Sequence, residues 1–533
     1  MNKIILKAAF AILLGGSVAS CTKDLDRFPT NDITSENVYS TFGGYQQAFA
    51  KVYGSFALTG NQGPAGNGDV QGIDEGTSDF LRLYWWVQEI STDEAVVQVG
   101  WNDPGIHFFH PMNWTTDNVI LKGIYYRSMY QITLANEFIR QSADAKLAER
   151  GITGANAATI KNYADEARFL RAYQYSVLMD LFGNPPFVTE ADLPGATLPQ
   201  QIKRADLFDW VNKQLVDLED KLPATNEYGR ASKNAARALL ARNFLNAEVF
   251  TGGAKEKYDS AALYARKVLD DGFSLVPDYR HLMLADNHTN TSEFILTINY
   301  DGIRTKGYGG TTFFTHASVG GNMTAFNYGI AGGWAGIRTT RNLPGLFPDV
   351  SGNLDQRAQF FTNGQSIDLT GEPAPTFNEG YAVTKYRNVT KTGAQGSNPD
   401  FADVDFPIFR TAEMNLIYAE AVVRKPSAGD RTVARNLIND LRTRAYGGST
   451  VGHITDAQLT LDFILDERGR ELYWEGFRRT DLVRFNKFTS DSYLWPWKGG
   501  VSSGTGVASY RDLFPIPVAD INSNTNLVQN PGY

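Results

Sequence analysis

Residues 466–486, DERGRELYWEGFRRTDLVRFN, concentrate the side chains of this 533-residue chain that could carry chemistry. The stretch holds five acidic and five basic residues, and every basic residue is arginine. A guanidinium presents a rigid fork of donors to a carboxylate and stacks on rings such as Tyr473, Trp474 and Phe477. The acids therefore either form a pair for acid/base catalysis or belong to ion pairs that hold helices together. The second interpretation is favoured, because ion-pair networks also perturb carboxylates, and it predicts a neutral, mutually paired network beneath a binding face.

Other catalytic and metal-binding patterns are weak. The six histidines include no HExxH motif and no Cys/His cluster, and the chain has no GxSxG elbow and no Walker loop. Acidic pairs occur at Asp74/Glu75 and Asp93/Glu94. Neighbours on a strand point to opposite faces, however, and sequence does not give the carboxylate separation that a glycosidase needs. We therefore expect no catalysis, and glycoside hydrolysis is kept as an alternative of a different class.

Hydrophobic spacing predicts a mainly α-helical scaffold with a minor β component. Apolar residues recur at helical intervals, which predicts helices over 119–140, 161–182, 205–222, 233–250, 261–269, 410–424, 434–441 and 458–486. Short strands are expected at 293–300 and 381–387. The pattern Ala-Arg-x-Leu-x-Ala at 167–172 recurs at 236–241, and this 69-residue shift is close to twice the 34-residue tetratricopeptide period. Stacked helix pairs of a repeat would bury one continuous core, whereas two unrelated alanine-rich helices are the alternative.

Long stretches rich in Gly, Asn and aromatic residues lie between the helices, at 60–118, 301–344 and 364–405. Loops of this length in a compact domain are usually functional or disordered, and their many Trp and Tyr argue against disorder. Sugars need an aromatic face for their C–H surface and directed partners for their hydroxyls. The loop aromatics therefore indicate a glycan-binding face, unless they only fix the loops to the scaffold; they are Trp85, Trp86, Trp101, Trp114, Tyr308 and Trp334.

The N-terminal residues predict export and lipid attachment. Residues 1–20 combine a basic start, a short apolar run and small residues directly before Cys21, as in a secretory signal with a lipoprotein cleavage site. Acylation of Cys21 would attach the protein to a membrane. We expect a signal peptide at 1–20, a flexible tether at 21–32 and one domain at 33–533. Removing residues 1–20 changes the formal net charge from −8 to −10, and with no basic stripe we expect no nucleic-acid binding.

Several motifs resemble the SusD-like (RagB/SusD) family of outer-membrane lipoproteins, and the likeness covers essentially the whole chain. The C-terminal signature is similar at 467–485 (ERGRELYWEGFRRTDLVRF), 493–500 (YLWPWKGG), 514–522 (FPIPVADIN) and 529–533 (QNPGY). Segments 72–82 (GIDEGTSDFLR), 91–96 (STDEAV) and 306–313 (KGYGGTTF) resemble the starch-binding branch of that family.

The resemblance implies a tetratricopeptide-like scaffold that displays a glycan-binding face on the cell exterior and performs no catalysis. It also implies capture of starch or malto-oligosaccharides and their delivery to a SusC-like TonB-dependent transporter. Another polysaccharide or a host glycan stays open as the ligand, and a purely protein-binding helical repeat is a further alternative. By motif position, the implied stacking residues are Trp101, Tyr308 and Trp334, and the implied hydrogen-bonding residues are Asp74, Arg82 and Asn102.

The resemblance also implies a structural calcium ion, with no other cofactor. Asp403 and Asp405 match part of the family's calcium site, whereas His288 stands where an acidic partner is expected.

Overall fold

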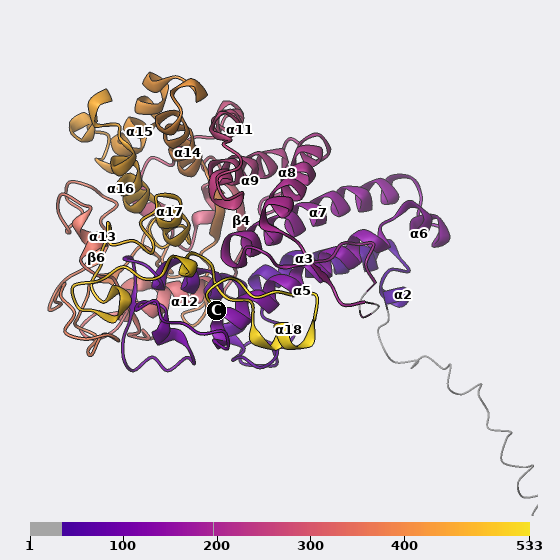
Figure 1. The fold of residues 1–533 in the computed structure, drawn as a ribbon, viewed down its shortest axis with the longest axis horizontal. Helices are drawn as coiled ribbons and strands as arrows, with labels where there is room; N and C mark the ends of the chain where they lie inside the picture. The colour runs from indigo at the N-terminus through magenta and orange to yellow at the C-terminus, as the bar shows by residue number, and fades with distance from the viewer. Residues whose placement is uncertain (1–34, 194, 196) are drawn as a thin grey trace, which may run out of the picture.

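The computed structural model describes residues 35–533 except 194 and 196 (Figure 1). Its α-helices are α2 Ser35–Val38, α3 Phe42–Ala57, α4 Phe80–Trp85, α5 Val119–Gln141, α6 Asp144–Glu149, α7 Gly154–Phe182, α8 Arg204–Lys221, α9 Lys233–Leu245, α10 Ala247–Phe250, α11 Tyr258–Asp270, α12 Gly310–Ala317, α13 Asn342–Gly345, α14 Thr411–Arg424, α15 Arg431–Ala445, α16 Leu461–Leu472, α17 Arg478–Arg484 and α18 Val518–Ser523. The strands form four antiparallel pairs, which are β1 Val96–Val97 with β5 Ile337–Arg338, β2 Pro186–Phe187 with β3 Gln200–Gln201, β4 Phe294–Ile298 with β8 Phe406–Arg410, and β6 Phe360–Phe361 with β7 Ala382–Val383.

The long helices pack one after another into an arc. Helix α5 packs on α7, α7 on α8, α8 on α9, α9 on α11, α11 on α14, and α14 on α15 and α16. Figure 1 shows α7, α8, α9, α11, α14 and α15 along the upper part of the molecule, with α5 below α7 and the long loops gathered at the lower left. The predicted scaffold of stacked helices with few short strands is therefore confirmed.

The 69-residue repeat has a structural counterpart. Arg168 on α7 donates to Asp217 near the end of α8 (2.7 Å), and Arg237 on α9 donates to Asp271 just after α11 (2.6 Å). Each matching arginine thus connects the first helix of a pair to the C-terminal end of its partner. The repeat in the sequence therefore corresponds to a repeated arrangement of helices in the structure.

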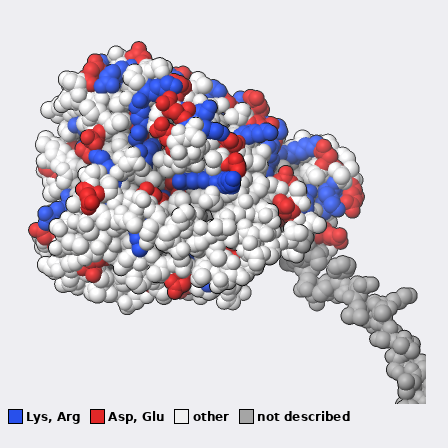
Figure 2. Space-filling view, in the orientation of Figure 1, with Lys and Arg blue, Asp and Glu red and all other residues white. Residues whose placement is uncertain are grey.

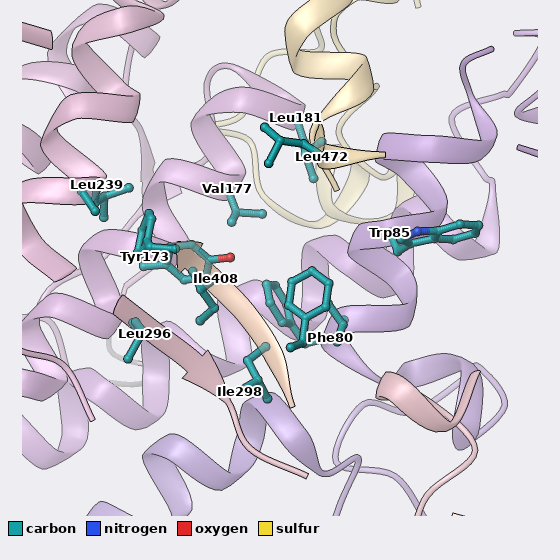
Figure 3. Packing of buried hydrophobic residues seen from close by; sticks show 14 of the residues in the cluster. Phe80, Trp85, Tyr173, Val177, Leu181, Leu239, Leu296, Ile298, Ile408 and Leu472 are labelled. Atoms are coloured by element: carbon teal, nitrogen blue, oxygen red, sulfur yellow. The ribbon is translucent and has the colours of Figure 1, made fainter. Parts of the chain in front are cut away.

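The core surrounds the β4–β8 pair. Figure 3 shows Tyr173, Val177 and Leu181 of α7 on one side of Leu296 and Ile298 of β4, with side chains from α4, α9, β8 and α16 around them. The expected strand at 293–300 is therefore present, whereas only residues 382–383 of the expected strand at 381–387 pair in β7. Among the described residues, no helix is long and apolar enough to cross a bilayer.

The single helix expected over 458–486 is wrong. The chain leaves α16 at Leu472 and enters α17 at Arg478, and Trp474 (φ 62°) and Gly476 (φ 82°) between them are left-handed. A right-handed helix cannot continue through such residues. Buried carboxylates accept the amides freed by the break, Glu94 from Trp474 N (3.0 Å) and Glu89 from Gly476 N (2.6 Å).

The charges of residues 466–486 form a buried ion-pair network, but they are not mainly paired with one another. Within the stretch, Arg470 pairs with Glu467, and Asp481 pairs with Arg468 and Arg484. The remaining strong pairs reach other elements and are Glu467 with Arg357 and Arg442, Glu471 with Arg357, Arg410 and Arg444, Glu475 with Lys385 and Arg410, Arg478 with Asp93, Arg479 with Asp180, and Arg484 with Glu420. Arg410 and Arg444 also pair with Glu293. The expected mutual pairing is therefore only partly right. We call this whole set the ion-pair network.

Charge is distributed unevenly over the surface. Figure 2 shows Lys, Arg, Asp and Glu mixed over the helices along the upper and right edges, whereas the lower part of the same face carries few charges. Exposed ion pairs such as Lys146 with Glu149 and Lys221 with Asp217 lie on the helices. The helical arc thus presents the solvated charges.

Candidate functional site

Three aromatic side chains from distant parts of the chain meet at one place. The ring centroids of Trp101 and Trp334 are 6.0 Å apart with an interplanar angle of 53°, and those of Tyr308 and Trp334 are 6.4 Å apart at 58°. Tyr308 is 39% exposed, and the two tryptophans are half-buried. The structure therefore brings together all three residues expected to stack on a ligand. We call this group the aromatic platform.

Short backbone pairing brings Trp101 to Trp334. Strand β1 pairs with β5, and beyond it Gln98 N donates to Gly336 O (2.7 Å). A Cβ at Gly336 would collide with the six-membered ring of Trp101, so only glycine lets the indole lie flat on this turn. Trp334 is held by its own amide, which donates to His316 O (2.9 Å), and its ring lies over the His316 imidazole at 4.9 Å.

Tyr308 is positioned by the turn that precedes α12. Asp79 caps α4 by accepting from Arg82 N (2.9 Å), and the same oxygen accepts from Gly310 N (2.8 Å). At Gly76 a side chain would collide with Tyr308 Cβ. The buried Asp79 carboxylate and Gly76 thus join the segment 76–82 to the turn that carries Tyr308.

Phe313 lies at the centre beneath the platform. Its buried ring contacts Trp101 edge-on (5.9 Å), Trp334 (6.5 Å) and Trp85 (5.4 Å). Trp85 in turn contacts Trp474 at the helix break (4.9 Å). The ion-pair network therefore does lie beneath the platform, separated from it by two layers of rings. Sequence reasoning missed Phe313, although it closes the KGYGGTTF segment.

The three residues expected to hydrogen-bond a ligand lie in different environments. Asp74 and Asn102 are exposed. The Arg82 side chain is only 6% exposed, donates to Tyr308 O (3.0 Å) and Asp103 Oδ2 (2.8 Å), and has a pKa that burial lowers. Arg82 is thus committed to protein groups under the platform, whereas Asp74 and Asn102 are free to meet solvent or ligand.

Three of the six loop aromatics are not surface residues. Trp85, Trp86 and Trp114 are each at most 1% exposed. The first two lie in α4 and in the π-helical turn 86–90 that follows it rather than in a loop. Trp114 donates from its ring N–H to the Tyr533 hydroxyl (2.7 Å). For these three the alternative interpretation is correct, since they fix segments to the core.

The acidic pairs do not form an accessible catalytic site. Asp93 accepts two hydrogen bonds from Arg478 (2.7 and 2.9 Å), and Glu94 faces the helix break; both are buried. Glu75 is buried and accepts from Thr59 and Ala65, which leaves Asp74 as the exposed member of its pair. No two of these carboxylates face each other across solvent.

The residues suggested for calcium are already occupied by hydrogen-bond donors. Asp403 accepts from Gly302 N (2.8 Å) and from Ser397, and Asp405 accepts from Tyr300 N (2.7 Å) and the Tyr228 hydroxyl (2.8 Å). Calcium requires six to eight oxygen ligands. Within the described part of the chain, no group of three His, Cys, Asp or Glu side chains could hold a metal ion. This arrangement does not fit calcium. The calcium site that the resemblance implies is therefore left to be tested by metal titration. The expected lipidation site, Cys21, lies outside the described residues.

Comparison with known proteins places the chain in a family. Residues 349–533 match the model of the SusD family. The whole chain is 33% identical over 580 aligned positions to the starch-binding protein SusD of Bacteroides thetaiotaomicron, and the alignment covers 99% of that protein. The chain belongs to the SusD family. A SusD-like protein of Formosa agariphila, P2, is 27% identical over 74% of this chain and 78% of its own length.

Solved structures of this family share the fold. A SusD superfamily protein from Parabacteroides distasonis aligns with a TM-score of 0.69 at 19% identity, covering 94% of this chain and 100% of its own. The surface glycan-binding protein A of Bacteroides thetaiotaomicron, solved in complex with laminarihexaose, aligns with a TM-score of 0.68 at 21% identity, covering 92% and 99%. At these identities the likeness concerns the fold alone.

Proposed function

We propose that this member of the SusD family is a cell-surface lipoprotein that binds starch or malto-oligosaccharides and delivers them to a SusC-like TonB-dependent transporter. The observation that carries the proposal is the tilt of the platform rings, 53° between Trp101 and Trp334 and 58° between Tyr308 and Trp334. The relative that is 33% identical over the full chain is named a starch-binding protein.

Ring tilt favours a curved glycan over a flat one. A sugar ring packs its C–H face against an aromatic face. In a flat β-1,4-glucan, successive sugar rings keep nearly parallel faces, so three rings turned by more than 50° cannot all stack on it. An α-1,4-glucan curls, and its successive faces turn with the curve. The platform therefore suits a short arc of α-glucan.

The proposed site has polar groups suited to sugar hydroxyls. Asp74 and Asn102 are exposed. Asn102 directly follows Trp101, and Asp74 accepts from the amide of Thr77, whose hydroxyl donates to Asp103. An open, partly hydrated site of this kind gives weak binding, and we expect a Kd of roughly 0.1 to 1 mM for a short oligosaccharide. Of the two acidic pairs considered as catalytic, Asp74/Glu75 and Asp93/Glu94, only Asp74 is exposed, which supports binding without hydrolysis.

Electrophoresis through native gels that contain amylopectin, laminarin, levan, xylan or mucin tests the ligand. The proposal predicts retardation by amylopectin. Retardation only by another polymer would assign a different glycan, and no retardation by any of them would favour a purely protein-binding repeat. Release of reducing ends from starch on prolonged incubation would instead make the protein an enzyme.

Surface attachment and the transporter partnership need separate tests. Labelling with a fatty-acid analogue should mark the wild-type protein and not a Cys21→Ala variant. Co-purification from detergent-solubilised outer membranes should recover a TonB-dependent transporter with the wild type, and recovery of none would remove the delivery step.

A further inference from the structure

Asp103 lies directly beneath the platform and accepts hydrogen bonds from three different segments. Its Oδ2 accepts from the Trp101 ring N–H and from Arg82 Nη2 (2.8 Å), and its Oδ1 accepts from the Thr77 hydroxyl (2.9 Å). The Asp103 side chain is 18% exposed. Both carboxylate oxygens of Asp103 therefore accept hydrogen bonds from other side chains of the protein.

The bond to Trp101 controls the one polar atom of that ring. Indole carries a single donor, Nε1–H, and a hydrogen bond to a carboxylate is short and about twice as strong as one between neutral groups. The other contacts of the ring are its packing on Gly336, the edge of Phe313, the Trp334 ring and the Arg82 guanidinium at 5.6 Å, and none of these is a hydrogen bond. Asp103 is thus the group that fixes how the ring is turned.

Arg82 extends this control to the second platform residue. Its guanidinium lies over the rings of Trp86 (4.6 Å) and Phe313 (5.0 Å), and its Nη1 donates to Tyr308 O (3.0 Å). A buried guanidinium needs an opposite charge, and its ion pair is with Asp103. The path from the Trp101 ring through Asp103 and Arg82 to the Tyr308 backbone links two of the three stacking residues.

We infer that Asp103 is a positioning residue that sets the angle of Trp101 within the platform and thereby its preference for curved over flat glucans. The inference rests on the proposed function, because the preference has meaning only if the platform binds a glucan. Arg82 takes part in this positioning through its bonds to Asp103 and to Tyr308 O.

A double-mutant cycle between Asp103→Ala and Trp101→Phe tests the inference. Phenylalanine keeps a stacking ring but has no N–H for Asp103 to accept. With maltoheptaose as the titrant, Asp103→Ala should weaken binding about tenfold in the Trp101 protein, or about 1.4 kcal/mol, and less than about twofold in the Trp101→Phe protein. Equal losses in both backgrounds would mean that Asp103 acts on the sugar itself or through Arg82 and Tyr308 rather than through the Trp101 ring, and would overturn the inference.

Two variants separate positioning from simple loss of structure. Asp103→Asn keeps one amide oxygen that can accept from the indole, and we expect an intermediate affinity. Thr77→Val removes a donor that bonds the other carboxylate oxygen, and we expect a smaller loss than for Asp103→Ala. Melting temperatures measured on the same samples must be similar for affinity to be compared. If Asp103→Ala melts much earlier, Asp103→Asn takes its place in the cycle.

Crystal structures keep the test independent of the proposed function. In Asp103→Ala without ligand, the Trp101 ring should depart clearly from its 53° angle to Trp334. A ring that stays at that angle contradicts positioning. If the wild type binds no maltoheptaose, the proposed function fails, and this angle still decides whether Asp103 holds the ring.

Discussion

The ion-pair network and the aromatic platform use the same residue types, arginine, carboxylate and aromatic rings, with opposite access to solvent. In the network, Arg410 donates to Glu293, Glu471 and Glu475, and all four side chains are at most 2% exposed. At the platform, one buried arginine, Arg82, contacts Trp101 and the Tyr308 backbone, and the platform side chains are partly exposed. In the ion-pair network, buried charges are paired with opposite charges and stabilise the fold. At the platform, a buried charge contacts aromatic rings and orients an exposed surface. The two regions should therefore respond to mutation in different measurements.

Contact between the two regions is indirect. Trp474 at the helix break touches Trp85, and Trp85 touches Phe313 under the platform. These rings are buried and closely packed. A change in the ion-pair network should therefore alter the platform only if this layer of rings moves. The question is whether mutations can change the stability of the fold and the affinity for ligand separately.

The largest effect is expected from Glu471→Gln. Glu471 pairs with Arg357, Arg410 and Arg444, and breaking a buried pair from one side costs about 3 to 5 kcal/mol of unfolding free energy. Chemical denaturation should show this loss, while maltoheptaose affinity per folded molecule stays at the wild-type value. Glu149→Gln, which removes an exposed pair with Lys146, is the control and should leave the unfolding midpoint unchanged. A loss of affinity in fully folded Glu471→Gln would join the two regions.

Trp334→Ala should give the reverse pattern. The ring contacts both other platform residues, and its removal should weaken maltoheptaose binding at least about tenfold with little change in melting temperature, since an aromatic contact is worth about 0.5 to 1.5 kcal/mol beyond its burial. Phe326→Ala is a matched control from the same loop, because that ring is 67% exposed and makes no contact with the platform rings. Wild-type affinity in Trp334→Ala would remove the platform from the site.

A smaller effect should appear on changing pH. Burial raises the pKa of Glu89 to about 7, and burial together with the nearby Glu89 charge raises the pKa of Glu94. The folded state therefore holds protons that the unfolded chain releases near 4.5, so this stabilisation is complete in acid and is lost as pH rises through about 7. Melting temperature should fall by a few degrees as pH rises from about 4.5 to about 7, and Glu89→Gln should flatten that fall.

The network should act in the opposite direction at low pH. Although burial alone would raise the pKa of Glu467, Arg357, Arg470 and Arg442 lower it to about 2. Its stabilisation is present above the ordinary value and is lost as pH falls toward 2. The pH profile of melting temperature should therefore have a maximum. A profile that rises continuously from pH 5 to 8 would contradict the protonated Glu89 and Glu94 pair.

The smallest effect is expected from metal removal. Asp403 and Asp405 accept N–H and O–H donors, so we expect EDTA and added calcium to change melting temperature by less than about 1 °C, which for a chain of this size corresponds to about 1 kcal/mol or less. A calcium-dependent rise of several degrees would show that these loops rearrange around an ion.

The sequence predicted the helical arc because its signal is local. Helical spacing at 119–140 and 205–222 matches α5 and α8 within a residue or two, and the Ala-Arg-x-Leu-x-Ala repeat matches helices whose arginines make equivalent bonds. The break at 473–477 could not be predicted in this way. It depends on Glu89 and Glu94, which lie nearly 400 residues away and accept the freed amides.

The sequence predicted the stacking residues of the site but not the residues that hold them in place. Motif likeness selected Trp101, Tyr308 and Trp334, which the structure brings together. Loop composition alone grouped them with Trp85, Trp86 and Trp114 and could not exclude these three, because burial depends on tertiary packing. Asp103 and Phe313 have no sequence signal of their own, since their roles come from contacts between distant loops.

The most direct measurement is a crystal structure of the protein grown with maltoheptaose at several times the expected Kd. The account predicts glucose rings stacked on Trp101, Tyr308 and Trp334 in one curved arc, with Asp74 and Asn102 within hydrogen-bond distance of hydroxyls and Arg82 still bound to Asp103 and Tyr308. Sugar bound elsewhere on the molecule, or a platform that stays empty at saturating maltoheptaose, would contradict it.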